Sequence, residues 1–265
     1  SIFGTRPEAI KMAPVVQQLE RHADRIRSLI CVTAQHRQML DQVIAVFGMQ
    51  ADFDLNIMQP DQSLSQVTAA VIQGLDPVIS ETKPDWILVQ GDTTTVMAAS
   101  LVAFYHRVRV GHVEAGLRTF DKHRPFPEEI NRRIADVTAD LCFAPTEWAR
   151  QNLLKEGVSD RQIRVTGNTV IDALLHVQAK DYRWEDGPLA GLPRNKRTVL
   201  ITAHRRESFG ERFRELCFAI KDLAVKYQRD CHFVYPVHPN PNVRTPVNAI
   251  LGAQGNISLI DPLDY

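Results

Sequence analysis

The chain has 265 residues, with 31 Lys and Arg against 31 Asp and Glu, and 44% of its residues are hydrophobic. These values are ordinary for a globular protein of one large or two modest domains. A formal net charge of zero argues against a dedicated nucleic-acid binder, which normally carries a basic surface. No apolar run approaches the roughly 18–20 residues of a membrane-spanning helix, and no signal-peptide pattern opens the chain. The four cysteines show no C-x-x-C spacing, so we expect reduced core thiols and a cytoplasmic protein.

Short β-branched runs alternate with amphipathic stretches through the first part of the chain. The apolar spacing predicts buried strands at 26–33, 86–90, 108–113 and 141–144. Helices are predicted between them at 7–21, 37–47, 63–81, 94–106 and 127–138. This alternation is typical of βαβ units with a parallel sheet that is covered on both faces.

A second round of the same alternation follows a predicted helix at 170–180 and a loop at 187–194. Its strands are predicted at 198–202, 231–236 and 257–260, with helices at 209–227 and 242–251. We therefore expect an α/β protein with two Rossmann-like domains, an N-terminal one over 1–167 and a C-terminal, nucleotide-binding one over 168–265. Three strands are few for a doubly wound sheet, so we expect the second domain to be incomplete.

Six polar segments follow the predicted strands, where ligands bind in open parallel sheets. They lie at 4–8, 33–37, 91–95, 114–118, 203–207 and 238–241. The first suits a phosphate, because Gly4 permits close backbone approach and a helix start offers free N–H groups. Arg6 and Lys11 add cations. The alternative is an ordinary helix start with solvated charges. Since both G-x-G-x-x-G and G-x-x-x-x-G-K-S/T are missing, a nicotinamide enzyme or an ATPase is disfavoured.

Three carboxylates are the candidates for acid and base chemistry. Asp92 and Glu114 each end a hydrophobic strand, where burial should raise the pKa of a carboxyl group. Glu128 follows Pro127 at a predicted helix start, where the helix dipole favours the ionised form. Such different environments suit a division into acid and base. The alternatives are that Asp92 caps a helix and that Glu128 only complements the dipole.

Further cations follow the same pattern. His204, Arg205 and Arg206 come directly after a predicted strand and would suit a diphosphate, or else form a solvated helix start. Arg132 is either a cation of the site or a surface charge. His112 and Glu114 do not match a zinc spacing such as H-E-x-x-H, so we expect no metal site.

Eight motifs give the sequence a family resemblance. They are F-G-T-R-P-E-A-I-K-M-A-P at 3–14, T-A-Q-H-R at 33–37, G-D-T-T-T at 91–95, G-H-V-E-A-G-L-R-T at 111–119, P-E-E-I-N-R at 127–132, T-G-N-T-V-I-D-A-L at 166–174, H-R-R-E-S-F-G at 204–210 and Y-P-V-H-P-N-P at 235–241. In these motifs the chain resembles the non-hydrolysing UDP-N-acetylglucosamine 2-epimerases of bacteria. The resemblance runs in order over essentially the whole chain.

The resemblance implies two Rossmann-like domains of the glycosyltransferase-B type and a homodimer without metal or nicotinamide. It implies reversible conversion of UDP-N-acetylglucosamine to UDP-N-acetylmannosamine, which supplies surface polysaccharide synthesis. UDP is eliminated to leave a 2-acetamidoglucal and is then added back after protonation of C2 from the other face.

Site residues follow from the same motifs. By resemblance the catalytic residues are Asp92, Glu114, Glu128 and His204, and the substrate-binding residues are Arg6, Lys11, Arg132 and His204. Gln35, Gln38, Arg205 and His238 match positions that bind a second UDP-N-acetylglucosamine as an allosteric activator. Asp61 departs from the pattern, because some members carry an arginine there that reaches the activator.

Three other functions are compatible with parts of the pattern. A hydrolysing 2-epimerase would release UDP and free N-acetylmannosamine. A glycosyltransferase of the same fold would need a separate acceptor, and the three carboxylates argue against it. A non-catalytic nucleotide-binding or scaffold protein is the alternative from a different class.

Overall fold

The computed structural model describes residues 1–33, 37–59, 61–204 and 209–263. The chain forms two compact units, residues 1–180 and residues 181–265. Every strand pair in the described ranges is parallel, and helices connect the strands. Among the described residues, none of the helices has the length and apolar character needed to cross a membrane.

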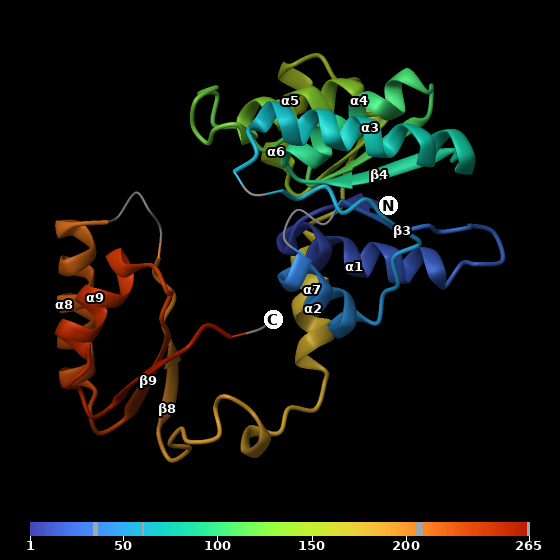
Figure 1. Ribbon diagram of the computed structural model, residues 1–265. Helices are drawn as coiled ribbons and strands as arrows, with labels where there is room; N and C mark the ends of the chain where they lie inside the picture. The colour runs from blue at the N-terminus through green and yellow to red at the C-terminus, as the bar shows by residue number, and fades with distance from the viewer. Residues whose placement is uncertain (34–36, 60, 205–208, 264–265) are drawn as a thin grey trace. The chain divides into compact units, whose positions relative to one another are not determined.

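The first half of unit 1 is a three-stranded sheet with its helices. The sheet has the order β1 (Ile2–Phe3), β2 (Cys31–Val32) and β3 (Phe53–Asp54). Helix α1 (Arg6–Glu20) packs against α2 (Arg37–Phe47), as Figure 1 shows.

The second half of unit 1 is a four-stranded sheet. Its order is β4 (Trp86–Gln90), β5 (Arg109–Val113), β6 (Leu141–Ala144) and β7 (Ile163–Val165). Its helices are α3 (Leu64–Thr82), α4 (Thr94–Tyr105), α5 (Glu128–Thr138), α6 (Glu147–Lys155) and the 3₁₀ turn η1 (Asp160–Gln162). Helices α3, α4 and α5 pack side by side (Figure 1).

Strand β1 is in contact with β4, so the three-stranded sheet and the four-stranded sheet meet at these two strands. The strand order reverses between β1 and β4. In open parallel sheets this reversal leaves a crevice at the carboxyl ends of the strands, where ligands bind. The loops after β1, β4 and β5 all start at this edge.

Unit 2 is a smaller layer of the same kind. Its sheet has the order β10 (Ile257–Ile260), β9 (Cys231–Pro236) and β8 (Arg197–Leu200). Helices α8 (Glu211–Lys226) and α9 (Pro241–Leu251) lie against each other (Figure 1), and the 3₁₀ turn η2 (Trp184–Asp186) precedes the sheet.

The predicted alternation is confirmed, with differences at some element ends. The strands predicted at 86–90, 141–144, 231–236 and 257–260 and the helix at 37–47 have the predicted bounds. The strand predicted at 26–33 is much shorter, and β3, β7 and α6 were not predicted. Three of the four cysteines are buried, the fourth is half-buried, and all four are free thiols.

The boundary between the two compact units lies after residue 180, later in the chain than the expected boundary after residue 167. Helix α7 (Thr169–Gln178) packs against α1 and therefore belongs to unit 1. Figure 1 shows α7 beside α1 and α2.

A buried group of charged side chains joins α5 to the end of β5. Asp136 Oδ1 lies 2.6 Å from Nδ1 of His112, and its Oδ2 accepts from Nη2 of Arg118 at 2.7 Å and from the amide of Gly116 at 3.3 Å. Arg118 also pairs with Glu156 at 2.6 Å. Burial opposes ionisation, but the charges and hydrogen bonds of His112 and Arg118 outweigh it and lower the pKa of Asp136.

Position 116 needs a glycine for two reasons, its backbone φ angle and the close approach of a neighbouring backbone. Its φ is +84°, and a Cβ there would lie 2.3 Å from the carbonyl oxygen of Ala149. Gly48 has a similar φ of +65°, but a Cβ there would have no described atom within 4 Å.

Gly116→Ala should therefore cost much more stability than Gly48→Ala. Both lose about 1–2 kcal/mol through the left-handed backbone, and only Gly116→Ala adds roughly 1–3 kcal/mol from overlap with backbone. Chemical denaturation of the two variants measures the difference. Equal losses would contradict this account of Gly116.

Asp136→Asn should lower the free energy of unfolding by about 3–5 kcal/mol at neutral pH, because it leaves buried cations without a counter-charge. The matched control is Asp160→Asn, which removes an exposed ion pair to Arg150 and should cost about 1 kcal/mol or less.

The pH dependence of the Asp136→Asn loss follows from two shifted pKa values. A carboxyl group whose pKa is lowered by folding stabilises the fold above its unfolded pKa, near 3.8, and loses this effect as the pH falls through the folded value. Asp136 also raises the pKa of His112, so the gap between wild type and variant should grow as the pH falls through the range where His112 gains its proton, and should shrink again in stronger acid as Asp136 itself is protonated. Denaturation curves from mildly alkaline to strongly acidic pH test this, and a gap that still widens in strong acid would contradict it.

Candidate active site

The carboxylate of Glu114 is the point where four segments of unit 1 meet. Its Oε2 accepts from Nζ of Lys11 on α1 and from Nε2 of Gln90 at the end of β4, both at 2.5 Å. Its Oε1 accepts from Nδ2 of Asn168, before α7, at 2.7 Å. Glu114 has a φ of +67°, a backbone conformation that is uncommon for a side-chain-bearing residue and that clusters at functional sites.

Asp92 lies on the neighbouring loop, after β4. Its Oδ2 accepts from Nη2 of Arg132 at 2.5 Å, and its backbone carbonyl accepts from Nδ2 of Asn131 at 3.0 Å. Burial raises the pKa of Asp92, and the charges of Glu128 and Glu114 add to this while Arg132 opposes it. The raised pKa expected for Asp92 is therefore confirmed.

Glu128 begins α5 and keeps a buried oxygen without a partner. Its Oε2 has no hydrogen bond within the described part of the chain, and the same holds for Nε of Arg132 and Oγ1 of Thr169. Buried polar atoms in folded proteins are almost always hydrogen-bonded. Unsatisfied atoms beside Asp92 and Glu114 mark a place for a polar ligand.

The loop after β1 differs in part from the expected phosphate cradle. The amides of Gly4 and Thr5 donate to Oε2 of the buried Glu8, at 3.1 and 2.7 Å, so they are not free for an anion. The expectation of free N–H groups is wrong at these two positions. Burial raises the pKa of Glu8, against the lowering effect of these hydrogen bonds.

Gly4 is needed for packing inside the protein. A Cβ at Gly4 would lie 2.0 Å from Oγ1 of Thr33 and 2.9 Å from Oγ1 of Thr95. Of the two expected phosphate cations, Lys11 pairs with Glu114, and Arg6 is half-buried at the first position of α1.

Among the described residues, two of the predicted site residues belong to unit 2, His204 and His238. His204 follows β8 and is exposed, and its ring stacks on that of His238, with centroids 5.5 Å apart and planes at 14°.

Gln35 and Arg205 lie outside the described residues. Gln38 belongs to α2, but its side chain is not among those described. Asp61 is exposed, with a φ of +56°.

Several partners of the carboxylates were not predicted from the sequence. Gln90, Asn131 and Asn168 donate to the site, and His112 and Asp136 hold the loops behind it. Asn131 and Asn168 lie inside the motifs P-E-E-I-N-R and T-G-N-T-V-I-D-A-L. Their place inside these motifs and their amide side chains were the available signal.

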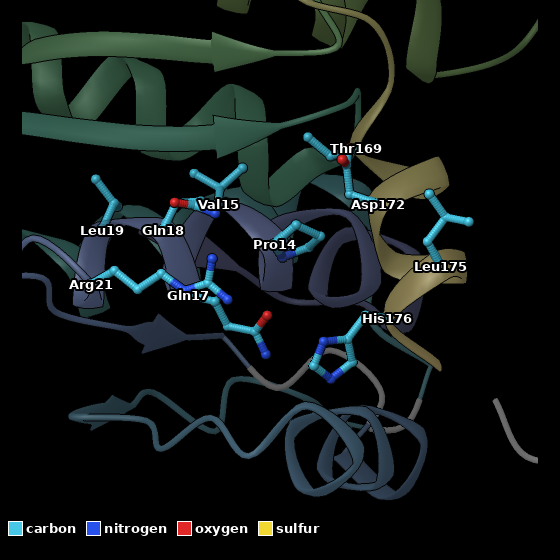
Figure 2. Close-up of a pocket in the computed structure, with 10 residues that line it drawn as sticks. All are labelled: Pro14, Val15, Gln17, Gln18, Leu19, Arg21, Thr169, Asp172, Leu175 and His176. Carbon is cyan, nitrogen blue, oxygen red and sulfur yellow. The ribbon is translucent and has the colours of Figure 1, made fainter. Parts of the chain in front are cut away.

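Within the described residues, neither a metal site nor the pocket beside α1 competes with this cluster. Within the described ranges, no group of three or more His, Cys, Asp or Glu side chains has a geometry that could hold a metal ion. A pocket between α1 and α7 is lined by Gln17, Arg21, Asp172 and His176, among others (Figure 2). It includes none of the three carboxylates.

Comparison with known proteins gives one consistent family. A family model described as UDP-N-acetylglucosamine 2-epimerase matches residues 17–265. The UDP-N-acetylglucosamine 2-epimerase of Escherichia coli K12 is 53% identical over 278 residues, which cover 100% of this chain and 72% of that protein.

Solved structures agree with this result. The crystal structure of UDP-GlcNAc 2-epimerase from Neisseria meningitidis bound to UDP-GlcNAc is 48% identical, with a TM-score of 0.86, over 100% of this chain and 72% of that one. The structure of UDP-GlcNAc 2-epimerase from Methanocaldococcus jannaschii is 31% identical, with a TM-score of 0.84, over 100% and 73%. The α/β fold with parallel sheets is that of these epimerase structures, and the chain belongs to the UDP-N-acetylglucosamine 2-epimerase family of isomerases.

Proposed function

We propose that this protein interconverts UDP-N-acetylglucosamine and UDP-N-acetylmannosamine by eliminating and re-adding UDP without hydrolysis. Family membership supports the reaction, and the Neisseria meningitidis relative was crystallised with UDP-GlcNAc. The observation that carries the mechanism is the convergence of Asp92, Glu114 and Glu128, with a buried oxygen of Glu128 left without a partner in the described ranges.

The reaction needs a base at C2 and a stabilised leaving group at C1. A carboxylate takes the C2 proton, the C–H electrons form the C1–C2 double bond, and the C1–O bond breaks to release UDP. The reverse steps return a proton to the other face of C2 and rejoin UDP to C1. Fixed cations favour the departure of an anionic leaving group.

We assign roles to the three carboxylates by comparing the hydrogen bonds that their oxygens already accept. Both oxygens of Glu114 accept hydrogen bonds from Lys11, Gln90 and Asn168, which suits a fixed anion that orients the site. Glu128 retains an open buried oxygen, and Asp92 has a raised pKa. Proton transfer at C2 is therefore assigned to Asp92, whose raised pKa suits a group that exchanges protons, and to Glu128, whose open oxygen is free to accept one.

Three cations of the proposal lie in unit 1. Arg132 pairs with Asp92 at the site, and Arg6 and Lys11 lie at the start of α1, close to the same strand edge. His204 is proposed to act on the nucleotide on the ground of family resemblance alone. No nicotinamide or metal is required by this route.

The proposals about an activator, the oligomeric state, the location and the biological role rest on family resemblance. A second UDP-N-acetylglucosamine is proposed as an activator that contacts Gln35, Gln38, Arg205 and His238. A homodimer, a cytoplasmic location and a role in surface polysaccharide synthesis belong to the same proposal.

The first test is proton NMR of the full-length protein with UDP-N-acetylglucosamine in deuterated water. The substrate is also the proposed activator, so it is supplied in excess. UDP-N-acetylmannosamine with deuterium at C2 is the expected product. Free N-acetylmannosamine with stoichiometric UDP would show a hydrolysing enzyme, and unchanged substrate with its C2 proton retained would contradict epimerisation.

Asp92→Asn and Glu128→Gln should each lower kcat by roughly 10²–10⁴-fold, because each removes a group that carries a proton in the reaction. Glu147→Gln on α6 is the matched control, since it alters an exposed carboxylate paired with Arg150. Rates of deuterium incorporation at C2 measure the effect. Wild-type exchange in either site variant would remove that residue from the mechanism.

A further inference from the structure

We propose that His112 is a positioning residue, which places Asp92 for proton transfer by donating a hydrogen bond to the carbonyl of Gly91. His112 itself lies behind the site, on β5, and its side chain is fully buried. The inference rests on the proposed function, since it concerns the geometry of a carboxylate assigned there.

The hydrogen bonds define which atoms of the His112 ring carry protons. Nε2 lies 2.7 Å from the carbonyl oxygen of Gly91, which can only accept, so Nε2 carries a proton. Nδ1 lies 2.6 Å from Oδ1 of Asp136, which Arg118 holds in its ionised form. Both ring nitrogens therefore donate, and the ring is an imidazolium.

The electrostatic surroundings agree with this assignment. Burial disfavours a charged ring and Arg118 repels it, but the charge of Asp136 and the two hydrogen bonds outweigh both effects and raise the pKa of His112.

Gly91 is held from two directions by β5. Its amide donates to the carbonyl of Val113 at 3.0 Å, and its carbonyl accepts from His112. Its φ of +82° marks the point where the chain turns from β4 into the loop. The direction in which the chain enters Asp92 is therefore fixed by His112 and by the strand that carries it.

The other side of Asp92 is held by different elements. Its carbonyl accepts from Asn131, its carboxylate from Arg132, and the next residue, Thr93, donates to Oε1 of Glu8 at 2.8 Å. Of these contacts, only that of His112 acts on the peptide group before Asp92. Removing this donor would leave Gly91 held by its amide alone, and would leave the contacts on the other side of Asp92 in place.

Two substitutions separate positioning from simple stability. In His112→Gln the side-chain amide nitrogen takes the place of Nε2, so the donor to Gly91 is kept and the bond to Asp136 is lost. In His112→Asn the amide nitrogen takes the place of Nδ1, so Asp136 keeps its donor and Gly91 loses its own. Both variants remove the ring charge.

We expect the more stable of the two variants to be the less active one. His112→Asn should keep the higher melting temperature and lose roughly 10²-fold in kcat with little change in KM, as expected when a catalytic group is misplaced. His112→Gln should be less stable and retain kcat about tenfold or more above that of His112→Asn. If kcat simply follows the melting temperature, the positioning role is overturned.

A measurement without substrate tests the same contact. Hydrogen–deuterium exchange of a peptide over residues 90–95 should accelerate in His112→Asn and stay close to wild type in His112→Gln. This result does not depend on the reaction, so an inactive wild-type protein would refute the proposed function and leave the exchange result as the test of His112. Equal exchange in both variants would overturn the proposal.

His232 supplies the matched control. It is also a buried strand histidine, on β9, but its Nε2 bonds Oγ of Ser258 rather than a loop of the site. His232→Asn and His232→Gln should show no inversion between kcat and melting temperature. An inversion there as well would mean that the pattern at His112 has no link to Gly91.

Discussion

The carboxylate of Asp136 is the interaction on which the geometry of unit 1 most depends. From α5 it bonds His112 and the amide of Gly116, the residues two before and two after Glu114. Glu114 and Gly116 both have positive φ, so this turn needs fixed neighbours to persist. Since an unpaired charge at this depth is costly, Asp136, His112 and Arg118 must be kept together or lost together.

The protein uses two sets of carboxylates at the same sheet edge. Glu8, Glu129 and Asp136 are buried and accept from backbone amides of the loops after β1 and β5. Asp92, Glu114 and Glu128 are only partly buried and bond side chains or retain an open atom. The first set shapes the loops, and the second is thereby presented at the crevice. The carboxylates proposed to react are therefore not the ones that hold the backbone of these loops.

The surroundings of the second set explain how three anions coexist in a small space. Lys11 compensates Glu114 and Arg132 compensates Asp92, each at hydrogen-bond distance. Burial, with the remaining repulsion added to it, raises the pKa of Asp92. Two cations among three carboxylates leave one negative charge uncompensated, which favours a proton on one of these carboxyl groups.

The sequence by itself determined the alternation of strands and helices, and it located Asp92, Glu114 and Glu128 at strand and helix ends, because hydrophobic periodicity and polar punctuation are local properties. Strands of two or three residues such as β3 and β7 carry no such period and were not predicted. Only the tertiary structure decided that Asn168 bonds Glu114, that Asp136 bonds His112, and that Gly4 makes room for Thr33. These partners lie far apart in the chain, and the order of the parallel strands brings them to one edge.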